Sequence, residues 1–418
     1  MININNPELT GGTSYWHRGE HVAEGSNEHR GWTYIFKNGA IGSTSQLTNT
    51  MVWLVRDGDV AAPKEYNSRV EGGTNHTLIL KENGELWGWG LNSWKQLGIN
   101  LPSKSTSPML LDHNNNYAAI SAGHDHSLAI KDDGSLVGWC ATANGKLGNQ
   151  ASSFLTTPTD MGLTNIKQIE AGYYHSMALK HDGTVWAWGK HDKGQLGHKQ
   201  AAIAKTPSQV SGLANIKHIE SGLNSSYALA TDGQIWSWGH NSYGQLGRTT
   251  QNNEHIPALV DGLDNVKTLA AGFNHALALK NDGSVWSFGT NTSYQTGHYQ
   301  RLYVQKVPYK IPSLSGIVSV AAGYNYSVAL KADGTVWTWG GNSYGQLGLG
   351  YKNTTETTPL QVPNINNAVA IEAHHTTTFV LLKTGELLAF GRNSASSIGN
   401  GSNQDVTTPV EVLSDVLN

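Results

Sequence analysis

A period of about fifty residues runs through most of this chain and limits its possible folds more than any other feature. Turn glycines recur at Gly84, Gly134, Gly183, Gly233, Gly283, Gly334 and Gly385. Subtracting successive positions gives spacings of 50, 49, 50, 50, 51 and 51 residues. A period this regular indicates an array of one supersecondary unit. The stretch from Ala171 to Gly197, AGYYHSMALKHDGTVWAWGKHDKGQLG, represents the unit.

Each copy contains an apolar lead-in, a short apolar run, a turn with Gly, a Trp-rich run, a loop and a tail with proline. Asp-Gly between two alternating runs is a strong hairpin signal, and helical spacing is nowhere sustained. Four short strands per unit, repeated radially, are typical of a β-propeller. We therefore predict an all-β fold, a seven-bladed β-propeller of four-stranded antiparallel blades over residues 66–418. The high glycine content, 48 of 418 residues, agrees with this turn-dense architecture.

Residues 1–65 do not match the repeat cleanly. A hairpin is plausible at 53–60 (WLVRDGDV), and another around Lys37-Asn38-Gly39. Either the region is a degenerate eighth blade, or it is an N-terminal extension, partly β. We favour the extension, because 14 residues separate Gly25 from Gly39 where the repeats have 11. Three tryptophans lie in this region: Trp16, Trp32 and Trp53.

The overall charge is close to balanced. The chain has 28 Lys and Arg against 31 Asp and Glu, a net charge of -3, so nothing favours nucleic acid or an anionic membrane as a partner. The one cysteine, Cys140, cannot form an internal disulfide. The N-terminus lacks the pattern of a signal peptide, and no apolar run approaches the roughly 20 residues of a membrane helix. We expect a monomer that is cytoplasmic, or exported without a classical signal peptide.

Tryptophans concentrate in the expected third strand of each unit, where we expect them to pack between blades. Ten of the 14 tryptophans lie there: Trp87, Trp89, Trp139, Trp186, Trp188, Trp236, Trp238, Trp286, Trp337 and Trp339.

A hydrogen-bonding residue starts the second strand of every unit. These residues are His76, His126, His175, Ser225, His275, Tyr326 and Thr377. A metal ion needs ligands that converge on one point, whereas these are spaced one per blade around a ring. We expect each imidazole to bond to the backbone of the next blade, and we expect no metal site and no cofactor.

Carboxylates occur near the end of four lead-ins: Glu71, Glu170, Glu220 and Glu372. Close to the axis they could hold a cation or supply the acid and base of a glycosidase. No nucleophile, Arg clamp or His–carboxylate pair recurs beside them in the sequence. We therefore predict no catalytic residues and no enzymatic activity.

The position after each lead-in glycine is the most variable in the unit. It holds Thr74, His124, Tyr173, Leu223, Phe273, Tyr324 and His375. In an up-and-down blade, these turns emerge on the same face as the loop that carries Trp94, Lys193, Tyr243 and Tyr344. Exposed aromatic rings on rigid turns are used in protein and sugar recognition. We predict that the residues at these two sets of positions bind a partner, Thr74 excepted; the alternative is that the rings fold down over the blade tops as packing.

The repeated motifs resemble those of the regulator of chromosome condensation repeat family. They are AGYYHSMALKHDGTVWAWG (171–189), SGLNSSYALATDGQIWSWGHNSYGQLG (221–247), AGFNHALALKNDGSVWSFG (271–289) and AAGYNYSVALKADGTVWTWGGNSYGQLGLG (321–350). The resemblance covers about 350 of the 418 residues. It implies a seven-bladed propeller, but the family's functions range from nucleotide exchange and ubiquitin ligation to ultraviolet reception and β-lactamase inhibition.

The function expected from these observations is a non-enzymatic scaffold whose aromatic face holds a protein partner. Two alternatives remain: a regulator or exchange factor of a small GTPase, and a carbohydrate-binding propeller. Family exchange factors use an inserted β-wedge, for which the spacings of 49 to 51 residues leave no room. The receptor's Gly-Trp-Arg-His-Thr motif is replaced by GYYHS, GHDHS and GFNHA, and the family's basic tail is missing, so neither light sensing nor chromatin binding is favoured.

Overall fold

The protein is seen here as a computed structural model. It describes four short strands between residues 14 and 43, and then residues 70–417 apart from 100–101, 113–116, 141–142, 151–153, 199–202, 251 and 301. The chain divides into two units, Met1–Asn67 and Ser68–Asn418.

In the first unit, β1 (Ser14–His17) pairs with β2 (Glu20–Ala23), and β3 (Thr33–Ile35) pairs with β4 (Ile41–Ser43). Val22 and Gly42 therefore belong to two separate strand pairs and do not form the inner hairpin of an eighth blade. Trp32, Trp53, the expected hairpin at 53–60 and the turn at 37–39 lie outside the described residues.

The second unit contains seven four-stranded antiparallel sheets, each built from four consecutive strands. The innermost strands, around the axis, are β5 (Val70–Gly72), β9 (Tyr117–Ala122), β13 (Ile166–Ala171), β17 (Ile216–Ser221), β21 (Val266–Ala271), β25 (Ile317–Ala322) and β29 (Ala368–His374). The second strands are β6 (His76–Leu80), β10 (His126–Lys131), β14 (His175–Lys180), β18 (Ser225–Ala230), β22 (His275–Lys280), β26 (Tyr326–Lys331) and β30 (Thr377–Leu382).

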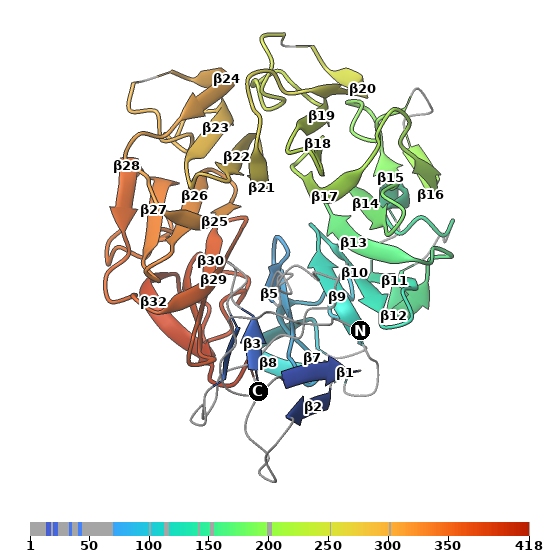
Figure 1. Ribbon diagram of the computed structural model, residues 1–418, viewed down its shortest axis with the longest axis horizontal. Coiled ribbons are helices and arrows are strands. Elements are labelled where there is room, and N and C mark those ends of the chain that lie inside the picture. Colours follow the sequence, from blue (N-terminus) through green and yellow to red (C-terminus); the bar gives the residue numbers. More distant parts are fainter. Residues whose placement is uncertain are drawn as a thin grey trace. The chain divides into compact units, whose positions relative to one another are not determined.

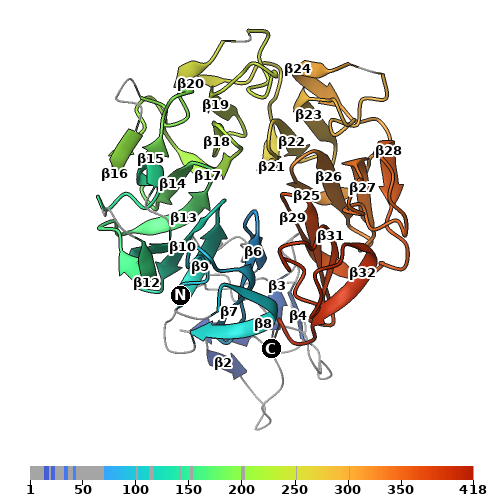
Figure 2. The same cartoon turned by 180° about the vertical axis from the view of Figure 1, so that it is seen from behind.

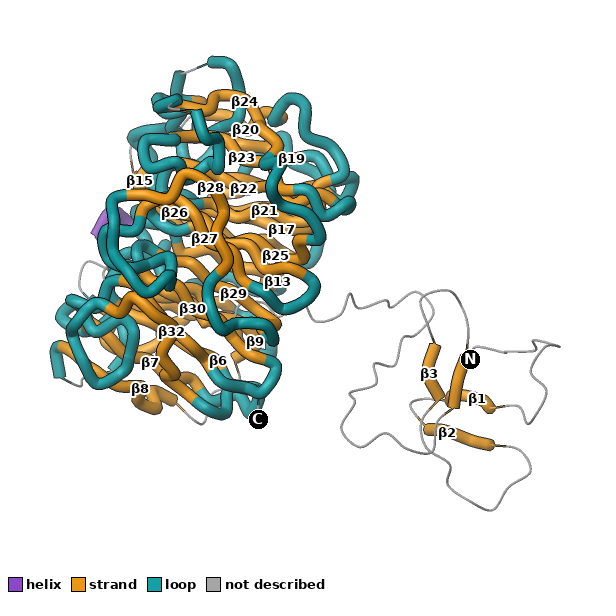
Figure 3. The backbone as a smooth tube through the Cα atoms, turned by 90° about the vertical axis from the view of Figure 1, so that its left-hand side faces the viewer, coloured by secondary structure: helices purple, strands orange, loops and turns teal. Residues whose placement is uncertain are grey.

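The third strands are β7 (Leu86–Leu91), β11 (Leu136–Cys140), β15 (Val185–Lys190), β19 (Ile235–Gly239), β23 (Val285–Thr290), β27 (Val336–Gly341) and β31 (Leu387–Gly391). The outermost strands are β8 (Lys104–Asp112), β12 (Leu155–Asp160), β16 (Ile203–Gln209), β20 (Glu254–Leu259), β24 (Val304–Lys310), β28 (Thr355–Gln361) and β32 (Val406–Leu413). The predicted seven-bladed propeller is thus confirmed (Figures 1 and 2). Strands dominate this unit, and its one helical segment within the described ranges is the 3₁₀ turn η1 (Ala143–Gly145) (Figure 3).

The hairpin turn between second and third strands follows from its sequence. Gly183 has a φ of 81°, in the left-handed region that favours glycine. Its N–H donates to the carbonyl of Lys180 at 2.9 Å, and the preceding Asp182 accepts the N–H of Thr184 on Oδ1 at 2.9 Å. The Asp side chain therefore closes the turn that Gly permits.

A glycine stands at the end of the lead-in in six of the seven blades because neighbouring blades approach closely there. A Cβ on Gly123 would lie 2.6 Å from the carbonyl oxygen of Gly172 in the next blade and 2.5 Å from Cε1 of His126. Neither contact is sterically possible. The small residues in the lead-ins are therefore required by crowding around the axis.

The hydrophobic core lies between the blades rather than within them. Seven clusters of buried residues each combine side chains of two adjacent blades. One joins the last blade to the first, where Trp89 and Ile79 pack with Phe379 and Ile398. Among the described strands the ring closes by packing, since all four strands of the last blade come from the C-terminal segment.

The second aromatic position of the third strands is a core position. The tryptophans that fill it in five blades are buried, as predicted, and Phe288 and Phe390 fill it in the other two. Trp188 is fully buried and packs on Leu128, Leu147 and Met161 of the preceding blade. Its indole N–H donates to the carbonyl of Lys146 in that blade at 2.6 Å. The first tryptophan is only half-buried, and in Trp186 the ring lies 4.6 Å from the ammonium of Lys180.

The histidines that begin the second strands join adjacent blades, but not as expected. Nε2 of His175 lies 2.9 Å from the hydroxyl of Ser226 in the next blade, rather than bonding to its backbone. That hydroxyl donates its single proton to the carbonyl of Gln195 at 2.8 Å, so the imidazole must be the donor to the serine oxygen. The same His–Ser bonds occur at His76, His126 and His275.

Candidate functional site

One end of the ring carries both sets of variable connections. The backbone N–H of Lys190, the last residue of β15, donates to the carbonyl of Tyr174, in the turn after β13, at 3.0 Å. The same bond joins Leu91 to Asn75 and Gly341 to Asn325. The predicted common face is therefore present, and we call it the loop face. The Asp-Gly hairpin turns, such as the one at Gly183, connect the other ends of the second and third strands.

Five aromatic side chains from five blades form a continuous cluster at the centre of the loop face. The ring of His124 stacks on Tyr173 with centroids 3.9 Å apart, and Tyr173 meets Phe273 edge to face at 5.6 Å. Phe273 in turn lies 4.2 Å from Tyr324, which lies 5.3 Å from His375. We call these five residues the central ring cluster.

The rings meet because the turns that carry them are joined around the axis. The N–H of Phe273 donates to the carbonyl of Gly323 at 3.2 Å, and the N–H of Tyr324 donates to the carbonyl of His375 at 2.6 Å. Tyr173 belongs to the third blade and Phe273 to the fifth. Their contact passes over the fourth blade, whose equivalent residue is the half-buried Leu223. The rings therefore converge toward the axis.

The central ring cluster is both packed and accessible. Tyr324 is 40% exposed, and the other four side chains are half-buried against one another. Rings held by such contacts present a surface without further loss of side-chain entropy on binding.

The remaining predicted partner-binding residues lie on the third-to-fourth-strand loops. Trp94 is exposed and packs 5.3 Å from Phe154, while Tyr243 is exposed beside His240 at 5.6 Å. Tyr344 carries the guanidinium of Arg392 on its ring at 4.8 Å. Lys193 is half-buried, and its N–H donates to Gln195. The ring contacts of Trp94 and Tyr344 thus join them to the following blade, and that of Tyr243 stays within its own loop; none of the three reaches the central ring cluster.

The histidines of the loop face are held neutral by their surroundings. Burial, and then the nearby Arg392 and His124, lower the pKa of His375 to about 4. Burial also lowers the pKa of His124, whose Nδ1 lies 2.9 Å from the hydroxyl of Thr74. At neutral pH the central ring cluster therefore carries no imidazolium charge.

The four predicted axial carboxylates do share one space. Burial, and then repulsion by Glu220 and Glu71, raises the pKa of Glu170 well above its ordinary value; Glu372 adds to this effect from the last blade. The pKa of Glu372 is raised in the same way by burial, Glu71 and Glu220. All four side chains are half-buried. Carboxylates from four blades, on innermost strands, are therefore close enough to repel one another.

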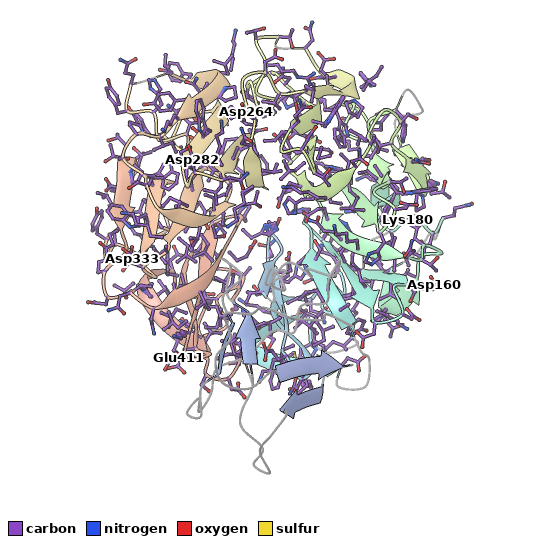
Figure 4. The ribbon with its side chains drawn as sticks, in the orientation of Figure 1. Asp160, Lys180, Asp264, Asp282, Asp333 and Glu411 are labelled. Atoms are coloured by element: carbon purple, nitrogen blue, oxygen red, sulfur yellow. The ribbon has the colours of Figure 1, made fainter. Side chains whose placement is uncertain are left out.

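No three His, Cys, Asp or Glu side chains in the described part of the chain are placed to hold a metal ion. Within the same residues, no helix is long and apolar enough to cross a membrane. Charged side chains such as Asp160, Lys180, Asp264, Asp282, Asp333 and Glu411 are spread over different blades of the ring (Figure 4).

Two features of the site were not foreseen from the sequence. His374 reaches past the first blade, and its Nε2 lies 3.1 Å from the carbonyl of Ala122 in the second. Lys146, fully buried, forms an ion pair with Asp125. A signal for this pair existed, because the second blade alone replaces the usual Gln and Asn of these positions by Lys and Asp, beside Cys140.

Seven four-stranded blades closed by packing, with a core of tryptophan and histidine between them, define a β-propeller built from fifty-residue repeats. The chain belongs to the RCC1-like domain family, whose family model matches residues 35–311. Two further matches, to the regulator of chromosome condensation (RCC1) repeat, cover residues 317–346 and 333–381.

Curated relatives match over a short part of their length. The probable E3 ubiquitin-protein ligase HERC4 of Rattus norvegicus is 36% identical over 108 residues, which are 25% of this chain and 10% of that protein. The ultraviolet-B receptor UVR8 of Arabidopsis thaliana is 30% identical over 114 residues, 26% of this chain and 26% of the receptor. Most of each relative therefore lies outside the matched stretch.

Two solved structures share the fold. Human WBSCR16 has a TM-score of 0.73 at 19% identity, and the match covers 79% of this chain and 94% of the WBSCR16 chain. Prp20p from Saccharomyces cerevisiae, studied for its binding to Gsp1p and histones, has a TM-score of 0.70 at 23% identity and covers 78% and 85%. At these identities the likeness establishes the propeller alone.

Proposed function

We propose that this protein is a non-enzymatic propeller scaffold that binds a protein partner on its loop face. The observation that carries the proposal is the central ring cluster, which collects aromatic side chains from five blades at one point. Aromatic anchors near the centre of an interface contribute most of the binding energy in protein complexes. The rigid ring of blades holds these anchors in place, and the variable turns supply the specificity.

A role as a small-GTPase regulator is the second candidate. It is supported by the fold shared with Prp20p, which binds Gsp1p. A nucleotide-release assay with a small GTPase separates this candidate from the first, since a scaffold without exchange activity leaves the release rate unchanged.

The first prediction concerns three rings of the cluster. Tyr173→Ala, Phe273→Ala and Tyr324→Ala together should abolish partner binding, because hot-spot aromatics contribute about 2 kcal/mol or more each. The melting temperature should stay within a few degrees, since none of the three belongs to the buried core. Capture of binding proteins from a cell extract, with mass spectrometry and comparison to the unmodified protein, measures the loss.

A matched control removes exposed aromatic area elsewhere. Tyr299→Ala with Tyr303→Ala changes two highly exposed rings of the fifth blade that lie outside the central ring cluster. This variant should retain the partner. Equal loss in both variants, or full retention in the triple variant, would contradict a central binding site.

A further inference from the structure

The axial carboxylates are close along the chain to the turns that carry the central ring cluster. Glu170 and Tyr173 are three residues apart at the end of β13, a distance of at most about 10 Å along an extended chain. Glu372 precedes His375 by the same three residues at the end of β29. The aromatic rings and a group of carboxyls therefore lie close together along the chain in these two blades.

The residues at the position of these carboxylates in the seven lead-ins can be named blade by blade. They are Glu71, Ser121, Glu170, Glu220, Ala270, Ala321 and Glu372. Gln168 donates to Glu170 at 3.2 Å, and Nε2 of His218 lies 3.0 Å from Glu220. The neighbours that shift the pKa of Glu170 and Glu372 are carboxylates and Gln168, with no Lys or Arg among them.

The loop face already places cations of its own chain on aromatic rings. The ammonium of Lys190 lies 4.6 Å from the ring centre of Tyr174, beside the central ring cluster. The guanidinium of Arg392 lies 4.8 Å from the ring centre of Tyr344. A cation on a ring face is attracted by the π electrons, and a nearby carboxylate adds to that attraction.

We propose that the central ring cluster and the carboxylates close to it along the chain form one recognition site for a cationic side chain, arginine or lysine, carried by the protein partner. The proposal rests on the proposed function and names the chemistry of the partner. The aliphatic stem packs on Tyr173, Phe273 and Tyr324, while the charged end faces the axis. Charge complementarity selects this occupant over a purely apolar one.

Binding of a cation should be coupled to protons. Because burial and mutual repulsion raise the pKa of Glu170 and Glu372, these carboxyls hold protons more readily than ordinary ones. A cation beside them favours the ionised form and lowers the pKa again. Affinity should therefore rise with pH over the range in which these carboxyls ionise, whereas a contact made by the aromatic rings alone has no such dependence.

The test uses the full chain and two short peptides. Acetyl-Gly-Gly-Arg-Gly-Gly-amide is titrated by ligand-observed NMR beside the same peptide with citrulline, which keeps the shape of arginine without its charge. We expect the arginine peptide to bind about tenfold more tightly, the size of a cation–π and carboxylate contribution. Equal binding of the two peptides, or no detectable binding of the arginine peptide, would overturn the proposal.

Variants of the carboxylates separate the two contributions. Glu170→Gln with Glu372→Gln should remove the preference for arginine and its pH dependence. The fold should be preserved, because a carboxyl with a raised pKa destabilises it when ionised. The control is Glu386→Gln, in the hairpin turn between β30 and β31 at the opposite end of the ring. This variant should keep both the preference for arginine and its pH dependence. Undiminished preference in the double variant overturns the assignment of the carboxylates.

Proteins captured by the aromatic triple variant and by the double Gln variant separate the recognition of a cationic side chain from the binding of a partner. If captured proteins are lost from the aromatic triple variant but retained by the double Gln variant, the loop face binds the partner, and the proposal that it recognises a cationic side chain is wrong. If neither variant loses them, both proposals fail. Loss from both variants supports both.

Discussion

A buried carbonyl oxygen is the point at which one blade is fixed to the next. In five of the seven interfaces it accepts both a hydroxyl and an indole N–H from the following blade, as Gln195 accepts from Ser226 and Trp238. The equivalent acceptors are Gln96, Lys146, Gln295 and Ser397. A carbonyl has two lone pairs, so each bond satisfies one of them.

The interface between the fourth and fifth blades shows how this arrangement tolerates change. Ala276 and Phe288 replace the serine and the tryptophan there, so neither donor is available. The hydroxyl of Tyr227 donates to the carbonyl of Gln245 instead, at 2.6 Å. Three substitutions thus leave the buried acceptor satisfied, which avoids a desolvation penalty of about 1–3 kcal/mol.

Trp188→Ala should lower the free energy of unfolding by roughly 3–5 kcal/mol, as a large-to-small change in a packed core. It also removes one donor from the carbonyl of Lys146. Urea unfolding followed by circular dichroism measures the change. Trp186→Ala, at the half-buried position of the same strand, should cost only about 1–2 kcal/mol. Equal costs would contradict the difference in burial.

The buried histidines should make the protein sensitive to acid. Burial lowers the pKa of His175 and His275 to about 3, whereas an unfolded chain has a histidine pKa of about 6.5. The unfolded state therefore binds protons first as the pH falls. Stability is complete above about pH 6.5 and is lost progressively below it, by on the order of 1–2 kcal/mol per histidine at pH 5.

This loss is measured as the free energy of unfolding at pH 7.5, 6 and 5. His175→Tyr with His275→Tyr provides the comparison, because Tyr326 fills the same position in the sixth blade and tyrosine does not titrate in this range. The variant should show a shallower dependence, by about two protons. An unchanged slope would mean that other groups control acid unfolding.

The outermost strand of every blade is interrupted at the same point. In β16, Ala204 pairs with Gly189 and Ser208 with Ala187, so three residues that end in Pro207 lie opposite one. The equivalent prolines are Pro108, Pro158, Pro257, Pro308, Pro359 and Pro409. A bulge and a residue without an N–H both make a poor template for a further strand.

Replacing three of these prolines should therefore promote association. Pro207→Val, Pro257→Val and Pro308→Val restore backbone donors on three neighbouring free edges. We expect light scattering to show self-association that increases with concentration. A control variant adds the same residue type just before prolines that are kept: Thr206→Val, Thr358→Val and Thr408→Val. We expect this variant to show no more self-association than the unmodified protein. If the control variant self-associates as well, the added hydrophobic side chains, and not the restored backbone donors, cause the association.

Strand elements were predictable because their signals are local. Asp182 and Gly183 specify a turn without help from the rest of the chain, and the turn sets the register of β14 and β15. The outer bulge was not predictable, although its proline is visible in every tail, because the bulge exists only in the pairing with the third strand. The partner of His175 was also missed, since the serine that accepts its N–H lies 51 residues away.

At the scale of the whole molecule, the number of blades followed from counting glycines, whereas the radial position of side chains did not. Spacing along the sequence places Tyr173 and Phe273 two blades apart. It does not show that both rings turn inward and touch over the axis.

The closed ring can be viewed as a matter of valence. Each blade of the repeating type presents an acceptor on one side and donors on the other, so a linear row of blades would end with one of each unused. The last acceptor, Ser397, meets the first donors, Thr77 and Trp89, and the two ends satisfy each other. An opened ring would expose complementary termini, and such chains would join head to tail into a filament rather than stay separate.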